Sequence, residues 1–184
     1  MRESRVCGIT VDSRLRGNDR RENSGNFSKR VSPKIMKITL CGSIAFYSEM
    51  VKVQKKLENL GHEVKLPPIK IKDGEGKLIS VEKYYEIRKK ASDNEKWVWE
   101  RKEEAIRNHF KKVEWSDAVL VLNYSKNGIP NYIGSNTFLE MGVAFYLKKK
   151  IFLLNPIPEI SSKEEILGMK PIVLNGDLSL VKMK

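Results

Sequence analysis

The stretch D-A-V-L-V-L-N, residues 117–123, is the strongest strand pattern in this sequence. Its central residues form a continuous apolar run, as expected of a strand that is covered on both faces. Similar short apolar runs stand before and after it in the chain, K-I-T-L-C at 37–41 and I-F-L-L at 151–154. Buried strands of this kind indicate a parallel sheet with helices on both faces.

The segments between these strands have the spacing of helices. Apolar residues recur every three or four positions over about 46–60, and Gly61 ends the run. Further helices are expected over about 81–113, from about 135 to 147, and in a short segment after 161. The candidate caps of these helices are Asp93, Ser135 or Asn136, and Ser161 or Ser162.

Two shorter strand patterns, at 62–66 and 171–174, complete the order of elements. Pro67-Pro68 and the glycines of 74–76 break the chain between elements. Strands that alternate with helices predict a parallel, doubly wound α/β sheet.

Residues 1–35 differ from the rest of the chain because polar and charged residues dominate and apolar periodicity is absent. Such a segment buries too little surface to offset its ordering entropy, so we expect a disordered tail. The stretch D-S-R-L-R-G-N-D-R at 12–20 resembles peptides translated from bacterial intergenic repeats, and Met36 opens the first strand pattern. Residues 1–35 are therefore interpreted as a start-site artefact before a domain at 36–184, with a basic nucleic-acid-binding arm as the alternative.

The net charge of the chain indicates which kinds of partner it attracts. The formal net charge is +12, from 35 Lys+Arg and 23 Asp+Glu. This excess attracts polyanions, so it indicates either a solvated lysine-rich surface or a preference for phosphorylated ligands or nucleic acid. No nucleic-acid motif appears with its usual spacing, so nucleic acid is not an expected partner.

The sequence supports neither a membrane protein nor a metal-binding protein. No run approaches the roughly 18 apolar residues of a membrane helix, and the first residues lack the apolar core of a secretory signal. Cys7 and Cys41 form no C-x-x-C pair and histidines are few, so neither a disulfide framework nor a zinc site is expected. These features predict a cytoplasmic protein without membrane association.

In a doubly wound sheet, ligands bind beyond the carboxyl ends of the strands. The segments expected to meet there are the Gly42-Ser43 turn, the 123–136 loop and the turn after Leu154. The Gly42-Ser43 turn offers backbone N–H groups to an anion, or its glycine simply permits a tight turn.

Glu140 is the first candidate catalytic residue. It lies in G-S-N-T-F-L-E-M-G-V-A-F, residues 134–145, and is the only charge from Phe138 to Leu147. A carboxylate near a helix N-terminus is favoured in its ionised form, and an ionised carboxylate can attack an anomeric carbon. The alternative is a glutamate that points to solvent.

His109, in the helix before the 117–123 strand, is a second candidate catalytic residue, although a lone helix histidine is more often a surface or core residue.

The runs K-I-T-L-C-G-S-I-A-F (37–46), W-S-D-A-V-L-V-L-N (115–123) and the segment 134–155 resemble the nucleoside 2-deoxyribosyltransferase superfamily. That superfamily includes the 2-deoxynucleoside 5-monophosphate N-glycosidases. The resemblance covers about residues 36–155. Its most specific element is E-x-G-x-A, here Glu140 to Ala144, followed by Lys149 and I-F-L-L-N.

The resemblance implies a flavodoxin-like three-layer α/β sandwich in which Glu140 is the nucleophile. It implies cleavage or transfer at the N-glycosidic bond of a nucleoside or nucleoside 5-monophosphate, without a cofactor or metal, by a homodimer or higher homo-oligomer. His109 stands where the family often has an aspartate that acts on the base, and a histidine can donate a proton near neutral pH. Residues of the sugar or phosphate site are expected to be Gly42, Ser43, Ser135 and Asn136.

Gly134 departs from the family, which usually has Asp or Ser six residues before the glutamate. This loss of a polar group favours an alternative class, a non-catalytic nucleotide-binding or sensor module of the same fold.

Overall fold

A parallel sheet forms the centre of the computed structural model, which describes residues 35–182. Within that range its strands are β1 (Lys37–Gly42), β2 (Glu63–Lys65), β5 (Ala118–Leu122), β6 (Lys150–Leu153) and β7 (Ile172–Val173). They lie in the order β2-β1-β5-β6-β7, and every pairing is parallel. Counted along the chain this is the order 2-1-3-4-5 of flavodoxin-like sheets, so the predicted fold class is confirmed.

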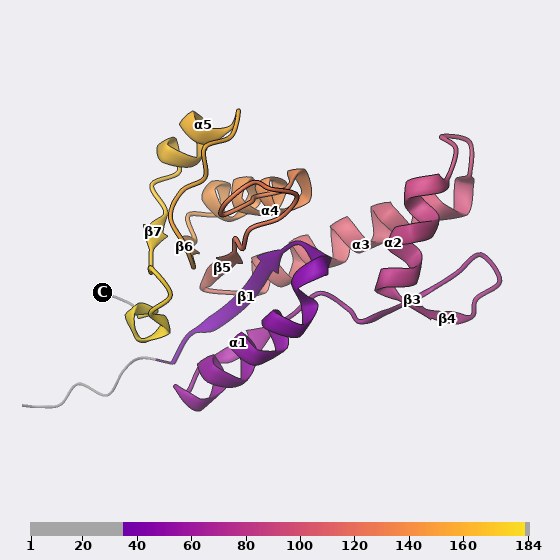
Figure 1. Cartoon of the computed structure of the whole chain (residues 1–184). Helices are drawn as coiled ribbons and strands as arrows, with labels where there is room; N and C mark the ends of the chain where they lie inside the picture. Colours follow the sequence, from indigo (N-terminus) through magenta and orange to yellow (C-terminus); the bar gives the residue numbers. More distant parts are fainter. Residues whose placement is uncertain (1–34, 183–184) are drawn as a thin grey trace, which may run out of the picture. The chain divides into compact units, whose positions relative to one another are not determined.

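Helices cover both faces of the sheet, which gives three layers (Figure 1). Alternate residues of β5 show the division: Leu120 and Leu122 pack with α1, whereas Val119 and Val121 pack with α4. The connecting helices are η1 (Ile44–Phe46), α1 (Tyr47–Asn59), α2 (Val81–Lys90), α3 (Lys96–Trp115), α4 (Ser135–Tyr146), α5 (Lys163–Gly168) and η2 (Leu178–Leu180).

A small antiparallel hairpin, β3 (Lys70–Lys72) and β4 (Leu78–Ser80), lies where the sequence predicted only chain breaks. Each strand has three residues, which is too short for a visible alternation of apolar and polar positions. The hairpin is held to α2 and α3 by a separate buried cluster of Ile79, Tyr84 and Val98. This cluster positions α2 beside the carboxyl edge of the main sheet.

The predicted helix caps are mostly wrong. Glu95, not Asp93, is the N-cap of α3, and Gly134 is the N-cap of α4, in both cases without a side-chain cap bond. Ser162 is the N-cap of α5, as one alternative had it, but its side chain also makes no cap bond. Ser135 begins α4 rather than preceding it, and lines a cavity. At these helix starts no side chain accepts a hydrogen bond from the first backbone N–H groups. Capping residues in the sequence therefore could not mark where the helices begin.

The predicted tail, residues 1–35, lies outside the described residues except for Ile35. Among the helices of residues 35–182, none has the length and apolar composition needed to span a lipid bilayer.

Candidate active site

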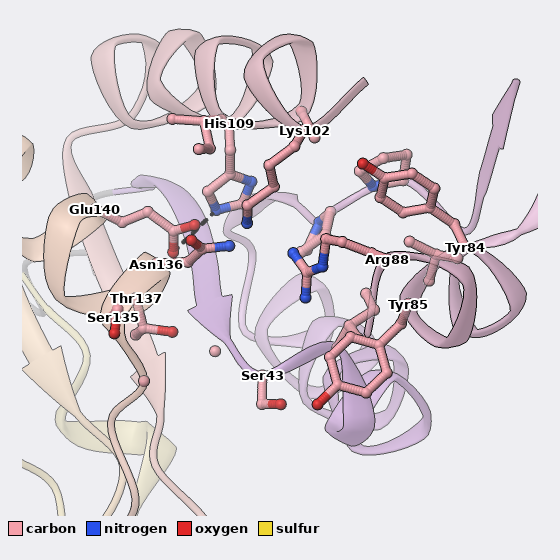
Figure 2. Close-up of a pocket in the computed structure, with 18 of the residues that line it drawn as sticks. Ser43, Tyr84, Tyr85, Arg88, Lys102, His109, Ser135, Asn136, Thr137 and Glu140 are labelled. Carbon is pink, nitrogen blue, oxygen red and sulfur yellow. Dashed lines mark ion pairs between the residues drawn. The ribbon is translucent and has the colours of Figure 1, made fainter. Parts of the chain in front are cut away.

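A cavity of about 540 Å³ opens beyond the carboxyl ends of β1 and β5. The order of the sheet reverses between these strands, which is where doubly wound sheets form a crevice. Its walls come from the Gly42-Ser43 turn, the loop before α4, the start of α4, and the facing sides of α2 and α3 (Figure 2). The turn after Leu154 was also expected here, but it does not line the cavity. Asn155 instead donates its backbone N–H to the Asn123 side chain at 2.8 Å.

The other predicted site residues do meet at this cavity. Its lining includes Glu140, His109, Gly42, Ser43, Ser135 and Asn136. They come from the end of β1 and the turn after it, from α3 and from α4, which are far apart in the sequence. Their roles stay predictions, but their common location is that of a single site.

A close approach of backbone explains Gly42 at the end of β1. A Cβ atom there would lie 3.1 Å from the Leu122 carbonyl oxygen and 3.1 Å from the Met50 side chain. Glycine therefore lets β1 run against β5 right up to the rim of the cavity.

Glu140 projects from the second turn of α4 toward His109 on α3 (Figure 2). Its side chain is 13% exposed, and His109 Nε2 lies 3.5 Å from its Oε2 atom. Among the described residues, none forms a hydrogen bond with this buried oxygen. A buried carboxylate oxygen without a partner is costly, and such atoms are found where a ligand completes the contact.

Burial raises the pKa of Glu140 to about 8, although a hydrogen bond from Cys41 and the charges of Lys102 and Lys112 act in the opposite direction. The carboxyl group is therefore mainly protonated at neutral pH. The expectation that the helix start holds it ionised is wrong, because Glu140 lies beyond the first turn, where the helix dipole has faded. Desolvation dominates at this position.

His109 is also neutral in this environment. Burial lowers the pKa of its imidazole to about 4, Lys112 acts in the same direction, and a hydrogen bond with the Leu40 backbone opposes both. Its Nε2 atom lies 3.7 Å from the Cys41 thiol. Burial, and then Glu140, raise the pKa of that thiol well above its usual value. An imidazole, a carboxyl and a thiol thus share one buried corner without a net charge at neutral pH.

Basic side chains on the opposite wall were not predicted from the sequence. In the described part of the chain, Arg88, Lys102 and Lys126 line the cavity, against one carboxyl group, that of Glu140. Lys126 Nζ donates to Ser43 Oγ at 2.7 Å. Burial, and then the charge of Arg88, lower the pKa of Lys102 to about 8. These groups lie in charged helices and a loop, where the sequence pattern resembles a solvated surface.

Tyr132 fills the place beside Gly134. A Cβ atom on Gly134 would lie 3.1 Å from the Cε1 atom and 3.1 Å from the hydroxyl oxygen of Tyr132. A larger residue at position 134 therefore requires this ring to move. The side chain that the family resemblance expects here is replaced by a tyrosine that itself lines the cavity.

Comparison with known proteins adds little to this geometry. Neither a protein-family model nor a curated protein matches the chain. A solved structure of 2-deoxyribosyltransferase from the psychrotolerant bacterium Bacillus psychrosaccharolyticus is similar, with 18% sequence identity and a TM-score of 0.39. The match covers 63% of this chain and 69% of that chain. The fold assignment therefore rests on the strand order and pairing, and the assignment of function rests on the cavity.

Proposed function

We propose that the protein cleaves or transfers at the N-glycosidic bond of a nucleoside 5-monophosphate, with Glu140 as the nucleophile. The observation that carries this proposal is the buried Glu140 oxygen without a hydrogen-bond partner at the end of a cavity of about 540 Å³. A cavity of this size accommodates one nucleotide. A desolvated carboxylate is a stronger nucleophile than one held by several donors, because it has fewer hydrogen bonds to lose on attack.

The first step is attack by the Glu140 carboxylate on C1 of the sugar. A C–O bond forms, the bond between C1 and the base nitrogen breaks, and the base leaves with the bonding electron pair. In the second step water or another base attacks C1, the C–O bond to Glu140 breaks, and the proton that the attacking group loses returns to the pair of Glu140 and His109. Water gives hydrolysis, and a second base gives transfer.

A single proton shared by Glu140 and His109 supports both parts of the first step. At neutral pH the pair holds one proton, since Glu140 has a raised and His109 a lowered pKa. When the proton moves from the carboxyl group to His109 Nε2, 3.5 Å away, the carboxylate becomes a nucleophile. The resulting imidazolium then protonates the leaving base. His109 therefore receives its proton from Glu140 and does not hold it at rest.

Charge favours a phosphorylated substrate over a plain nucleoside. Arg88 and Lys102 repel each other enough that the charge of Arg88 helps to lower the Lys102 pKa. A phosphate between them and Lys126 relieves this repulsion through charge-assisted hydrogen bonds. The ring of Tyr85 lies within 5.7 Å of Lys126 Nζ and 5.2 Å of the Arg88 guanidinium, which keeps these cations at the same wall. Tyr84 and Trp99 supply aromatic surface for a base.

The test is to incubate the protein with a panel of nucleosides and their 5-monophosphates and to measure free base. Wild type is expected to release base from at least one 5-monophosphate. Glu140→Gln should reduce the rate by several orders of magnitude, because an amide does not form the glycosyl-enzyme. Glu164→Gln, an exposed change on α5, is the matched control and should leave the rate unchanged. Equal rates for wild type and Glu140→Gln would exclude Glu140 as the nucleophile.

The alternative is a nucleotide-binding module without catalysis, favoured by the protonated state of Glu140 at neutral pH. In that case the panel yields no free base, and a 5-monophosphate binds without being consumed.

A further inference from the structure

Three metal-ligating side chains meet at the buried end of the cavity. Cys41 lies in β1, His109 on α3 and Glu140 on α4, and their sulfur, nitrogen and oxygen ligand atoms all lie within 4.8 Å of one another. Short sequence spacing cannot reveal this set, because each residue comes from a different element. The expectation of no zinc site rested on spacing along the sequence, so it could not include this cluster.

We propose that Cys41, His109 and Glu140 form a three-ligand site for a thiophilic divalent ion, of which Zn²⁺ is the example. The Cys41 sulfur lies 3.7 Å from His109 Nε2, and this nitrogen lies 3.5 Å from Glu140 Oε2. Tetrahedral zinc with ordinary bond lengths places a sulfur and a nitrogen ligand about 3.6 Å apart, and a nitrogen and an oxygen ligand about 3.4 Å apart. These two distances are therefore already close to those that the ion requires.

The buried oxygen of Glu140 is the independent sign of a missing ligand. It is the only buried side-chain nitrogen or oxygen atom in residues 35–182 that lacks a hydrogen-bond partner. A metal bond supplies that partner directly. The combination of thiolate, imidazole and carboxylate also selects zinc over magnesium or calcium, which prefer oxygen ligands alone.

Charge makes both anionic ligands necessary. Lys102 and Lys112 act on Glu140 through space, so a bare dication in this corner meets repulsion. On binding, the Cys41 thiol and the Glu140 carboxyl group each release a proton to solvent. The two negative ligands then balance the two positive charges of the ion, and the buried complex is neutral.

The site has a route of access and an open position. His109 and Glu140 line the cavity, whereas Cys41 is fully buried behind it. The ion therefore enters through the cavity, where a water molecule takes the fourth position, as in zinc sites with three protein ligands. Binding of this ion is a property additional to the proposed N-glycosidic function. The bound ion prevents that reaction, because it occupies the carboxylate that attacks C1.

The experiment uses the reduced, full-length protein after treatment with a chelator. Zn²⁺ is titrated in competition with a chromophoric chelator, and Co²⁺ is then added to fresh protein to record its absorption spectrum. We expect one Zn²⁺ per chain. Co²⁺ should give a thiolate-to-metal charge-transfer band and the intense visible bands of a tetrahedral site.

Variants assign the ligands. Cys41→Ser and Glu140→Gln should each weaken Zn²⁺ binding by at least about 100-fold, since loss of a supporting residue alone costs roughly 10 to 100-fold. Cys41→Ser should also remove the charge-transfer band. His62→Asn changes the other histidine, and Cys7→Ser the other cysteine, so both are controls that should keep full affinity. Circular dichroism checks the fold of each variant, and Glu140→Gln carries the test if Cys41→Ser fails to fold.

Two results would overturn the site: no Zn²⁺ binding by wild type, or binding that both ligand variants leave unchanged. A Co²⁺ spectrum without a charge-transfer band would likewise remove Cys41 from the proposal. None of these measurements depends on catalysis. If the protein releases no base from any nucleotide but binds Zn²⁺ as described, the proposed function is refuted and the metal site is supported.

Discussion

At the scale of single residues, the proton shared by Glu140 and His109 predicts the pH dependence of catalysis. The pair holds one proton between pKa values of about 4 and about 8, and the proposed reaction transfers that proton to the leaving base. We predict that kcat/KM is flat near neutrality and falls above about pH 8, when the last proton leaves. The measurement is base release with a chelator present from about pH 7 to about pH 10, where a 5-phosphate, with a second pKa of roughly 6, no longer titrates.

His109→Asn separates the two roles of the pair. Without the imidazole the proton has no carrier, and the ionisation of Glu140 limits the chemical step. The lower rate of this variant should therefore rise with pH through about 8. A wild-type rate that rises in the same way would show that His109 carries no proton to the base.

Glu140 also predicts a pH-dependent stability. Its pKa is raised from 4.5 to about 8 in the folded protein, so the folded state holds the proton more tightly than the unfolded state does. Stability from this group is complete below about pH 4.5 and is lost as pH rises through about 8. Glu140→Gln has no proton to lose. Its Tm should equal that of wild type near pH 5 and exceed it by at least about 4 °C above pH 8, where about 1 kcal/mol corresponds to roughly 2–4 °C. A constant difference in Tm across this range would contradict the raised pKa.

At the scale of elements, α2 carries the cation that the proposed function assigns to the 5-phosphate. Arg88 lies on α2 and points into the cavity (Figure 2). Arg88→Gln should raise the KM for a 5-monophosphate by roughly 10-fold or more, because a charge-assisted contact is lost, and should leave the KM for the nucleoside unchanged. Arg107→Gln on α3 is the control, since that side chain is 72% exposed and pairs with Glu103. Equal losses for both substrates would place the phosphate elsewhere.

The strands and long helices could be predicted from the sequence because their burial leaves a pattern. β5 is buried along its whole length, and its apolar run of residues predicted it. The hairpin of β3 and β4 could not be predicted, since the buried Ile79 is flanked by exposed residues and no alternation extends beyond it. The N-cap residues Gly134 and Glu95 make no side-chain cap bond, so these two helix starts have no capping motif in the sequence.

The same distinction applies to the site. Glu140 and Gly42 could be predicted because each interrupts a local pattern, a charge in an apolar helix and a glycine after a buried strand. Arg88 and Lys102 could not, because they stand in helices rich in charge, where a functional cation resembles a solvated one. Only the packing of α2 and α3 around the hairpin cluster turns these side chains toward the cavity. The contact of Cys41 with His109 is a tertiary event of the same kind.

At the scale of the whole molecule, α4 exposes apolar side chains that do not line the cavity. Leu139 is 50% exposed and Tyr146 is 83% exposed, and helical spacing places Val143 between them on the same face. Val143 and Leu147 border a shallow hollow whose lining also includes Phe110 and three charged residues of α3, Arg107, Lys111 and Glu114. Exposed apolar side chains with polar groups around them mark sites of protein contact. We propose that a second copy of the chain covers it, in line with the homo-oligomer that the family resemblance implies.

The closeness of this face to the site gives the assembly a consequence for catalysis. Glu140 lies next to Leu139 on α4, so a partner that packs on Leu139 and Tyr146 would restrain the helix that carries the proposed nucleophile. We predict a homodimer in light scattering at micromolar concentration, and a monomer for Tyr146→Glu, because a charge cannot be buried unpaired in an apolar contact. Leu78→Glu, on the hairpin and 60% exposed, is the control and should stay dimeric. The Tyr146→Glu monomer should keep its helical content while it loses base release. A wild-type monomer, or a dimer that survives Tyr146→Glu, would show that this face of α4 is not the contact between copies.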